Sequence, residues 1–293
     1  SGTHRGGCVS EMIPRSYNLD GAMKVLKDHE KICRESGIKK RLPASLGNQA
    51  VILMNRGELD EALRLFKEVE IICREIGYNK DLIRSLEYQA DILLDRNEFD
   101  GAMALLEEVE LNYRKLGDAA ALPRVLSTQA YILIRSGELE DAMRSLEEQE
   151  QLSRELGDVE FLMRSFGDQA SILRKRGDIN AAMALHQKEE QICREIEDID
   201  GLLRSLNAQS MILFTRGDLD DAMGLMKETE RLCRERGDLA GLGHVLSTEG
   251  AVHLTRGDFN NAMPLYLEEE QICRELGDIQ GLAGSLGNQA VIR

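Results

Sequence analysis

Tryptophan is absent from this sequence, and the other aromatic residues are few. Aromatic residues make up 4% of the 293 residues, and only 4 residues are proline. Hydrophobic residues nevertheless reach 42%, so a buried core must consist mainly of aliphatic side chains. Because proline interrupts helices, its scarcity favours long helices over many short strands.

The chain also lacks the features of proteins that bind nucleic acids or cross membranes. Its formal net charge is −15, whereas binding to a phosphate backbone relies on an excess of Lys and Arg. No apolar run approaches the roughly 18 residues that would suggest a transmembrane helix, and the N-terminus has no signal-peptide segment. We expect a cytoplasmic protein with neither nucleic acid nor a membrane as its partner.

What the sequence does contain is a repeat of 40 residues without insertions or deletions. We call a set of residues spaced 40 apart a register. One register holds only alanine: Ala22, Ala62, Ala102, Ala142, Ala182, Ala222 and Ala262. Another holds only leucine: Leu42, Leu82, Leu122, Leu162, Leu202, Leu242 and Leu282. A fixed period of this length indicates an architecture in which each repeat packs on its neighbours.

Each repeat contains two segments with the apolar periodicity of a helix, such as residues 81–96 and 99–116. Glycines such as Gly57 and Gly77 follow these segments, where a helix commonly ends in a left-handed residue. The aspartates after the glycines are predicted to be N-caps: Asp60, Asp100 and Asp220 before a second helix, and Asp118, Asp158, Asp198, Asp238 and Asp278 before a first helix. The sequence therefore predicts an all-α fold, an α-solenoid of antiparallel helix pairs.

The repeat also suggests where the domain begins and ends. Seven second helices follow from Asp20 onward, and the last repeat has only its first helix. We expect a single solenoid over residues 20–293, and we read residues 1–19 as a degraded first helix or a remnant, since they contain Pro14 and little periodicity. We interpret the incomplete last repeat as the result of trimming. Its apolar end leaves end-to-end self-association through the terminal helix as an open alternative.

The turn "GELDEA" at residues 57–62 and a small residue in the register of Ala50, Ala90, Ala130 and Ala170 resemble the tetratricopeptide repeat. The period of 40 differs from that family's usual 34. It resembles the branch with longer helices found in kinesin light chains and in the Pins-type G-protein-signalling modulators. The resemblance covers residues 20–292 and implies a right-handed superhelix whose first helices line a concave groove.

Two features depart from the family's usual pattern. Arg74 and its equivalents stand where the shorter repeat has its closing proline, so we expect a longer second helix. Glutamine stands where the family usually has leucine: Gln49, Gln89, Gln129, Gln169, Gln209 and Gln289.

Two polar registers on the second helix do not vary, and we predict a structural role for both. Glutamate occupies one of them: Glu30, Glu70, Glu110, Glu150, Glu190, Glu230 and Glu270. Arginine follows four residues later: Arg34, Arg74, Arg114, Arg154, Arg194, Arg234 and Arg274. An exposed pair in this orientation contributes only about 0.3–0.5 kcal/mol, so we expect partly buried pairs that also bond the glutamine register or the neighbouring turn.

We find no arrangement that would support catalysis, a metal or another cofactor. Five cysteines recur once per repeat, at 33, 73, 193, 233 and 273. Packed helices lie about 8–10 Å apart, more than the roughly 7 Å between Cα atoms that a disulfide allows, so we expect buried thiols. The sequence has no C-x-x-C, H-x-x-x-H, G-x-S-x-G or Walker-type phosphate-binding motif. We therefore expect a protein that is not an enzyme and has no cofactor.

Several registers of the first helix vary freely, and their spacing puts them on one helical face. Packing does not require small residues, aromatics and both charge signs on the same face, so we predict that these positions line the groove. The predicted groove residues in these registers are Asn48, Tyr88, Asp91, Tyr131, Arg135, Asp168, Lys175, Asn207 and Met211.

A further register carries arginine near the start of successive first helices: Arg84, Arg124, Arg164 and Arg204, with His244 in the next repeat. Arginine there opposes the helix dipole, so another interaction must favour it. Acids three or four residues earlier provide a partner for three of these arginines but not for Arg124. In the Pins-type relatives an arginine aligned with this register helps to hold acidic peptide side chains, which implies a row of guanidiniums for carboxylates. Pairing within the protein and ligand binding both remain open.

The leading interpretation is a protein–protein interaction scaffold that binds a peptide segment, with an acidic segment as one option, in the groove of the first helices. The alternative is a regulatory, sensor or oligomerisation segment of a larger multidomain protein. Helical repeats that read RNA usually have a basic groove, which the net charge of −15 disfavours.

Overall fold

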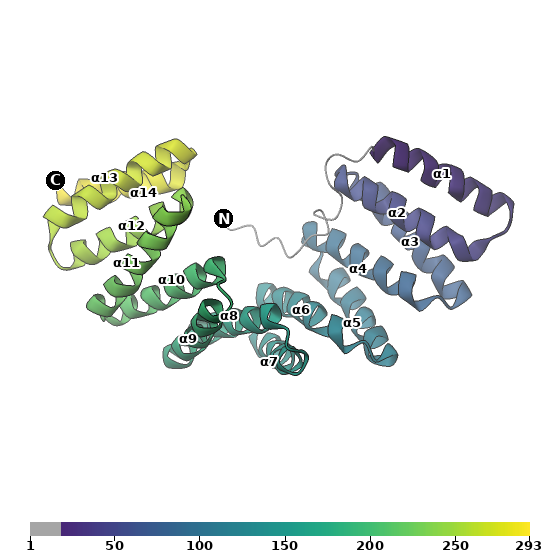
Figure 1. The fold of residues 1–293 in the computed structure, drawn as a ribbon, viewed down its shortest axis with the longest axis horizontal. Helices are drawn as coiled ribbons and strands as arrows, with labels where there is room; N and C mark the ends of the chain where they lie inside the picture. Colours follow the sequence, from purple (N-terminus) through teal and green to yellow (C-terminus); the bar gives the residue numbers. More distant parts are fainter. Residues whose placement is uncertain (1–18) are drawn as a thin grey trace. The chain divides into compact units, whose positions relative to one another are not determined.

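A computed structural model describes residues 19–293, which are almost entirely α-helical and contain no strand in that range (Figure 1). The predicted all-α solenoid of helix pairs is confirmed. The predictions for Pro14 and the rest of residues 1–18 lie outside the described residues. Contacts divide the chain into two compact parts, here called the N-terminal part, up to Gly157, and the C-terminal part, from Asp158. The expectation of one solenoid over residues 20–293 stays a prediction.

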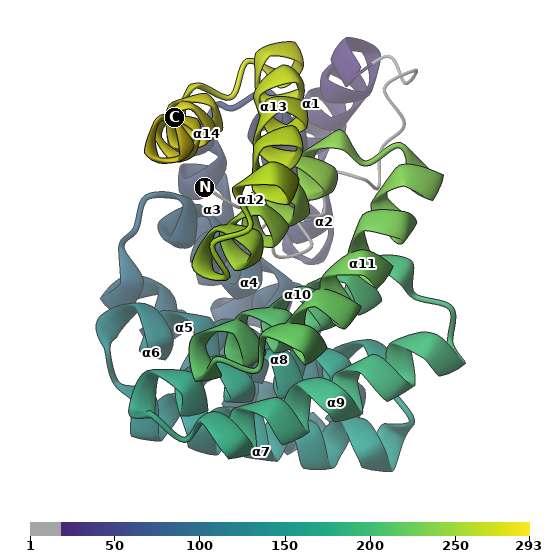
Figure 2. The same ribbon diagram turned by 90° about the vertical axis from the view of Figure 1, so that its left-hand side faces the viewer.

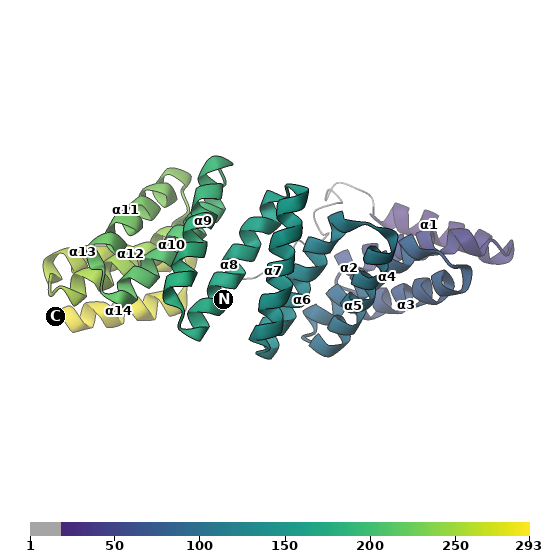
Figure 3. The same ribbon diagram turned by 90° about the horizontal axis from the view of Figure 1, so that it is seen from below.

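The N-terminal part consists of helices that each pack against the next one along the chain (Figure 3). They are α1 (Leu19–Glu35), α2 (Leu42–Asn55), α3 (Leu59–Ile76), α4 (Asn79–Asp95), α5 (Phe99–Leu116), α6 (Leu122–Ser136) and α7 (Leu139–Leu156), with short 3₁₀ turns η2 (Lys39–Arg41) and η3 (Ala119–Ala121). The even-numbered helices here are the first helices of the repeats, and the odd-numbered ones are the second helices.

The C-terminal part continues the same alternation. Its helices are α8 (Val159–Arg176), α9 (Ile179–Glu195), α10 (Ile199–Arg216), α11 (Leu219–Arg236), α12 (Leu239–Thr255), α13 (Phe259–Leu276) and α14 (Ile279–Ile292). Helix α13 packs against both α12 and α14 (Figure 2). Arg74 lies in the last turn of α3, so the second helix extends through this register as expected.

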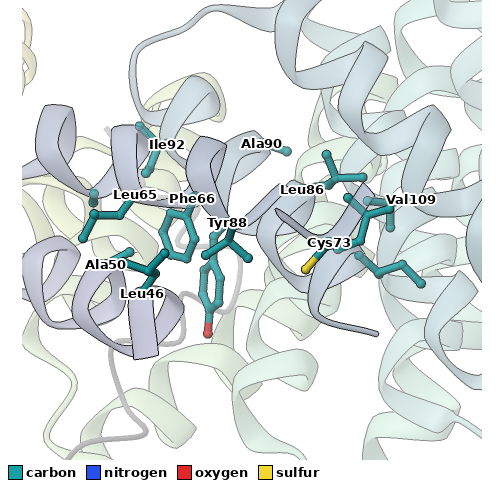
Figure 4. Packing of buried hydrophobic residues seen from close by; sticks show 14 of the residues in the cluster. Leu46, Ala50, Leu65, Phe66, Cys73, Leu86, Tyr88, Ala90, Ile92 and Val109 are labelled. Atoms are coloured by element: carbon teal, nitrogen blue, oxygen red, sulfur yellow. The ribbon is translucent and has the colours of Figure 1, made fainter. Parts of the chain in front are cut away.

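Most members of the two alanine registers are buried. Six members of the Ala62 register are completely buried: Ala62, Ala102, Ala142, Ala182, Ala222 and Ala262. Ala50 and Ala90 on the first helices are also completely buried, beside the leucines Leu46 and Leu86 (Figure 4). Because interiors are close-packed, a larger side chain at these points would force the helices apart. This requirement explains why the Ala62 register does not vary and why the Ala50 register has only small residues, Ser210 and Gly250 among them.

The glycines end the helices as predicted. The glycines that follow helices have φ between 68° and 87°, and Asn97 and Glu197 adopt the same left-handed conformation in the repeats that lack glycine. The predicted caps of the first helices are confirmed at Asp158, Asp198, Asp238 and Asp278, each of which accepts a backbone N–H bond at 3.0–3.2 Å. Asp118 precedes η3 and makes no such bond.

The predicted caps Asp60, Asp100 and Asp220 are wrong by two residues. The N-cap of α3 is Glu58, and Asp60 is the second residue of the helix. The same shift applies to α5 and α11, whose N-caps are Glu98 and Asp218. The helix starts directly after the turn because the N-cap is the residue that follows the left-handed position, so the aspartate is free to contact another helix.

The constant polar registers form the network that the sequence predicted. Gln89 Nε2 on α4 donates to Glu70 Oε2 on α3 at 2.8 Å, and Arg74 Nη2 bridges Glu70 and Glu108 at 3.0 and 2.8 Å. Similar Gln–Glu bonds join Gln49 to Glu30, Gln129 to Glu110, Gln209 to Glu190, and Gln289 to Glu270. Burial alone would raise the pKa of Glu30, but the bonds from Gln49 and Arg34 outweigh it and lower that pKa.

The five cysteines in the described part of the chain are buried and unpaired. Burial raises the pKa of Cys73 to about 11, so this thiol stays protonated at neutral pH. The prediction of buried thiols is confirmed for these five, and Cys8 lies outside the described residues.

Candidate functional site

The predicted groove residues come from the first helices, and most of them are accessible. The exposed ones are Asn48, Arg84, Arg124 and Arg135 in the N-terminal part and Arg164, Lys175, Arg204 and Met211 in the C-terminal part. The half-buried ones are Asp91, Tyr131, Asp168 and Asn207. The prediction that these residues bind a ligand stays a prediction, since no ligand is present.

Tyr88 differs from the expectation of an exposed aromatic residue. Its side chain is only 6% exposed, and its ring stacks on that of Phe66 with 4.9 Å between the centroids and 18° between the planes (Figure 4). The ring of Phe66 on α3 provides an apolar surface for Tyr88, and stacking on it buries the Tyr88 ring. The sequence could not distinguish the two, since Asn48 and Thr128 occupy the same register.

Above this stacked pair lies a recess between α2 and α4, with a volume of about 70 Å³. Asn48 and Arg84, which come from neighbouring repeats, both line it. The Arg84 guanidinium lies 5.6 Å from the centre of the Tyr88 ring, and its Nη2 donates to the Tyr88 hydroxyl at 3.5 Å. Asp81 also lines the recess. Among the described residues, however, neither Asp81 nor any other carboxylate lies within the 4 Å of an ion pair with Arg84.

Arg124 has a carboxylate partner outside its own helix. Its guanidinium is paired with Glu87 on α4, in the preceding repeat, and the hydroxyl of Tyr113 on α5 donates to the same oxygen at 2.8 Å. Burial raises the pKa of Asp91, one turn further along α4, to about 6, although Arg124 opposes this rise. The expectation that Arg124 lacks an acid is therefore wrong, because its partner lies on a helix of the preceding repeat and not on its own helix.

The other two arginines of the row also differ from each other. Arg164 pairs with Glu160 at 3.2 Å, and its guanidinium lies 5.3 Å from the ring centre of Phe161. Within the C-terminal part, Arg204 has no carboxylate within 4 Å, because Asp200 instead accepts a bond from Arg236 at 2.5 Å. Each part thus contributes one guanidinium with a carboxylate partner and one without.

Two other kinds of feature, a metal-binding cluster and a membrane-spanning helix, were sought in the described residues. Across residues 19–293, no group of His, Cys, Asp or Glu side chains is arranged to hold a metal ion. None of the helices in this range combines the length and the hydrophobicity needed to cross a lipid bilayer.

Comparison with known proteins agrees with this architecture. The family model of the tetratricopeptide repeat matches residues 44–76. No curated protein matches the sequence.

Three solved structures illustrate the similarity in fold. The first is a Signal Transduction ATPase with Numerous Domains protein with a tetratricopeptide repeat sensor from Pyrococcus horikoshii, with a TM-score of 0.73 and 14% identity, over 91% of this chain and 42% of that one. The second is a set of nearly identical tetratricopeptide-like repeats, described as those of a kinesin light chain, from Podospora anserina. It has a TM-score of 0.55 and 16% identity, over 68% of this chain and 97% of that one.

The third structure is a Rap protein complexed with Competence and Sporulation Factor, with a TM-score of 0.54 and 12% identity, over 96% of this chain and 87% of that one. At these identities the likeness concerns the fold. Residues 44–76 match the tetratricopeptide repeat, and the fold of the chain is that of a tetratricopeptide repeat protein.

Proposed function

We propose that this chain is a protein–protein interaction scaffold whose first helices bind a peptide segment of a partner. Repeat solenoids present a continuous surface whose variable positions face a ligand while the constant ones hold the stack. The Rap protein of similar fold is complexed with Competence and Sporulation Factor, which supports ligand binding by this architecture.

The observation that carries the proposal is the recess between α2 and α4. The Arg84 guanidinium lies there over the ring of Tyr88 and has no carboxylate partner among the described residues. Asn48 adds an amide from the neighbouring repeat. A guanidinium and an amide side by side suit a carboxylate, which accepts two hydrogen bonds from such donors. We assign to this recess an acidic side chain or the C-terminal carboxylate of the partner segment.

The charges around the recess limit how acidic the partner is. Asp81, which lines the recess, lies on the same helix as Arg84. Glu87 and Asp91 follow on that helix, where Arg124 pairs with Glu87 and opposes the rise in the pKa of Asp91. A uniformly acidic peptide would be repelled by this part of α4. The partner segment that fits best has a single acid opposite Arg84 and neutral or basic residues beyond it.

Fluorescence polarisation with a library of labelled peptides, each containing one Glu, tests the proposal against the same peptides with Gln. We expect Glu peptides to bind more tightly, and Arg84→Gln to weaken them roughly tenfold without changing the Gln peptides. Arg64→Gln is the matched control, because Arg64 is an exposed arginine on α3 that pairs with Glu61. If no peptide binds, the scaffold proposal fails; if Glu and Gln peptides bind equally, only the role of Arg84 fails.

A second candidate is the sensor segment of a larger protein. The similar part of the Pyrococcus horikoshii protein covers 42% of that chain, which is described as having a tetratricopeptide repeat sensor. A sensor would change its own dynamics when it binds a ligand. Hydrogen exchange of the chain with a bound peptide should then show altered protection well beyond α2 and α4, whereas a passive scaffold would show changes only at the contact.

A further inference from the structure

A second arginine register links successive repeats. The arginine that follows a first helix reaches back to the aspartate at the second position of the preceding second helix. Arg56 pairs in this way with Asp20, Arg96 with Asp60 at 2.5 Å, and Arg256 with Asp220 at 2.6 Å. These arginine side chains are about 28–33% exposed, so their stems lie against the protein.

One repeat has the aspartate of this bridge without the arginine. Asp100 keeps its place on α5, but Ser136 stands where the neighbouring repeats have Arg96 and Arg176. Asp100 and Ser136 line the same recess, which lies between α5, α6 and α7 and has a volume of about 350 Å³. The recess is therefore found where the usual arginine side chain is missing.

The opposite substitution shows how the structure behaves when the other partner is lost. Asn180 replaces the aspartate in one repeat, and Arg216 in that repeat pairs with Asp218 at 3.1 Å instead. Arg216 thus finds a carboxylate nearby. Asp100 finds no cation within 4 Å among the described residues.

The lining of the recess has the two chemical parts that an arginine side chain needs. Met103, Ile132 and Leu133 provide apolar surface from α5 and α6. The carboxylates of Asp100, Glu107 and Glu138 also line it, and within the described part of the chain none of them is in an ion pair.

The remaining acids of the recess are already paired. Glu110 bonds Arg114 and Gln129, and Asp141 bonds Arg144. The net charge of the lining is therefore negative even after the internal pairs are counted.

We propose that this recess binds an arginine side chain on the surface of a partner protein. The aliphatic stem covers Met103 and Leu133, and the guanidinium donates to Asp100 in the manner of Arg96 with Asp60 in the preceding repeat. Arginine fits better than lysine because its planar fork can donate to two carboxylates at once. A bare cation would leave the apolar floor exposed.

This site is independent of the peptide-binding proposal. None of its lining residues belongs to the predicted groove, and its occupant has the opposite charge to the carboxylate assigned to Arg84. A partner could use one site without the other, so each can fail separately.

NMR titration of the labelled chain with the blocked tripeptide acetyl-Ala-Arg-Ala-amide tests the proposal. The citrulline tripeptide is the matched ligand, since it has nearly the same shape without the charge. We expect saturable shifts of amides around Asp100, Leu133 and Ser136 with the arginine peptide and roughly tenfold weaker binding of the citrulline peptide. Equal shifts with both peptides, or shifts only elsewhere, would overturn the proposal.

Two variants sharpen the test. Ser136→Arg should restore the internal bridge to Asp100, fill the recess and abolish the titration, while Asp100→Asn should weaken it about tenfold. Gly224→Arg is the control for added charge, because Gly224 is exposed on α11 and a Cβ there would meet no other residue within 4 Å. If Ser136→Arg leaves the titration unchanged, the recess is not the binding site.

Free arginine should bind more weakly than the tripeptide because its own carboxylate is repelled; tighter binding would point to a free amino acid as the ligand and contradict the proposal.

Discussion

Gln89 Nε2 donates to Glu70 Oε2 at 2.8 Å, and this bond joins the first helix of one repeat to the second helix of the repeat before it. Gln89 is only 2% exposed. A buried amide of this kind fixes where the two helices meet, because its bond can form in only one relative position of the two helices. The glutamine that departs from the usual leucine is therefore part of the stack.

Replacing Gln89 by leucine should destabilise the chain by about 1–2 kcal/mol. The apolar side chain fits the site, but Glu70 loses the donor to one of its oxygens and is left only partly compensated. Chemical denaturation measures the change. Gln151→Leu serves as the control, since Gln151 is exposed and its bond to Glu155 spans one turn of α7. Equal stability of wild type and Gln89→Leu would mean that water replaces the amide without loss.

One repeat has a glutamate in the glutamine register, and we predict that a lysine compensates for its buried charge. Glu249 is fully buried where the other repeats have glutamine, and Lys227 Nζ donates to both Glu249 and Glu230, at 2.6 and 2.8 Å. Lys227→Ala should cost about 2–3 kcal/mol, because it leaves a buried carboxylate without a cation. Combining it with Glu249→Gln should recover most of the loss by restoring the usual bond to Glu230.

A double-mutant cycle measured by denaturation tests this coupling. Additive effects of the two substitutions would show that Lys227 and Glu249 act independently, which contradicts the compensation.

The constant registers could be predicted from the sequence because the repeats serve as their own comparison. Residues such as Ala62 and Glu70 recur in each second helix, so a shared packing role follows without a structure. The variable registers offer no such comparison. Tyr88 is buried because Phe66 happens to offer a ring, and Glu87 pairs with Arg124 across a gap of 37 residues.

The recess at Ser136 was equally hidden in the sequence. Ser136 visibly interrupts a register of arginines, but the aspartate partner lies 36 residues earlier, as Arg96 and Asp60 show. Only the packing of α5, α6 and α7 shows that a recess lies beside Asp100, where the other repeats have an arginine side chain. The caps at Asp60 and Asp100 were misplaced for a related reason: the turn geometry, and not the residue type, determines where a helix begins.

Arg124 and Arg84 should respond differently to the same substitution. Arg124→Gln removes the cation from Glu87 and Asp91 and should lower stability by about 1 kcal/mol, a modest value because the guanidinium is half exposed. Arg84→Gln breaks no ion pair and should leave the melting temperature nearly unchanged. Thermal denaturation of both variants distinguishes the roles. A similar loss in Arg84→Gln would mean that the Tyr88 contact serves the fold.

Helix α14 exposes several apolar side chains, among them Ile279 and Val291, and its self-association can be measured. Leu286 is 43% exposed, whereas its equivalents Leu46 and Leu86 are fully buried. If α14 associates end to end with a second copy, the average mass in sedimentation velocity should rise with concentration, and Leu286→Lys should prevent it. Ile71→Lys, at another exposed apolar site, should not. A mass that stays constant over the concentration range would exclude this association.

Asp91 should make the stability of the N-terminal part depend on pH. Burial raises its pKa from 3.8 to about 6 in the folded chain, so the folded state binds the proton more tightly than the unfolded state. Its contribution is therefore most favourable below about pH 4 and is lost as the pH rises through 6. Asp91→Asn should stabilise the chain by roughly 1–2 kcal/mol at pH 7 and have little effect at pH 4.

Denaturation of wild type and Asp91→Asn at both pH values measures the difference. Asp95→Asn is the control, because Asp95 lies one turn further along α4 in an exposed position. A stabilisation by Asp91→Asn that is equal at pH 4 and pH 7 would mean that the substitution acts through packing. If it destabilises the chain at pH 7, the attraction of Asp91 to Arg124 outweighs the cost of burying the charge.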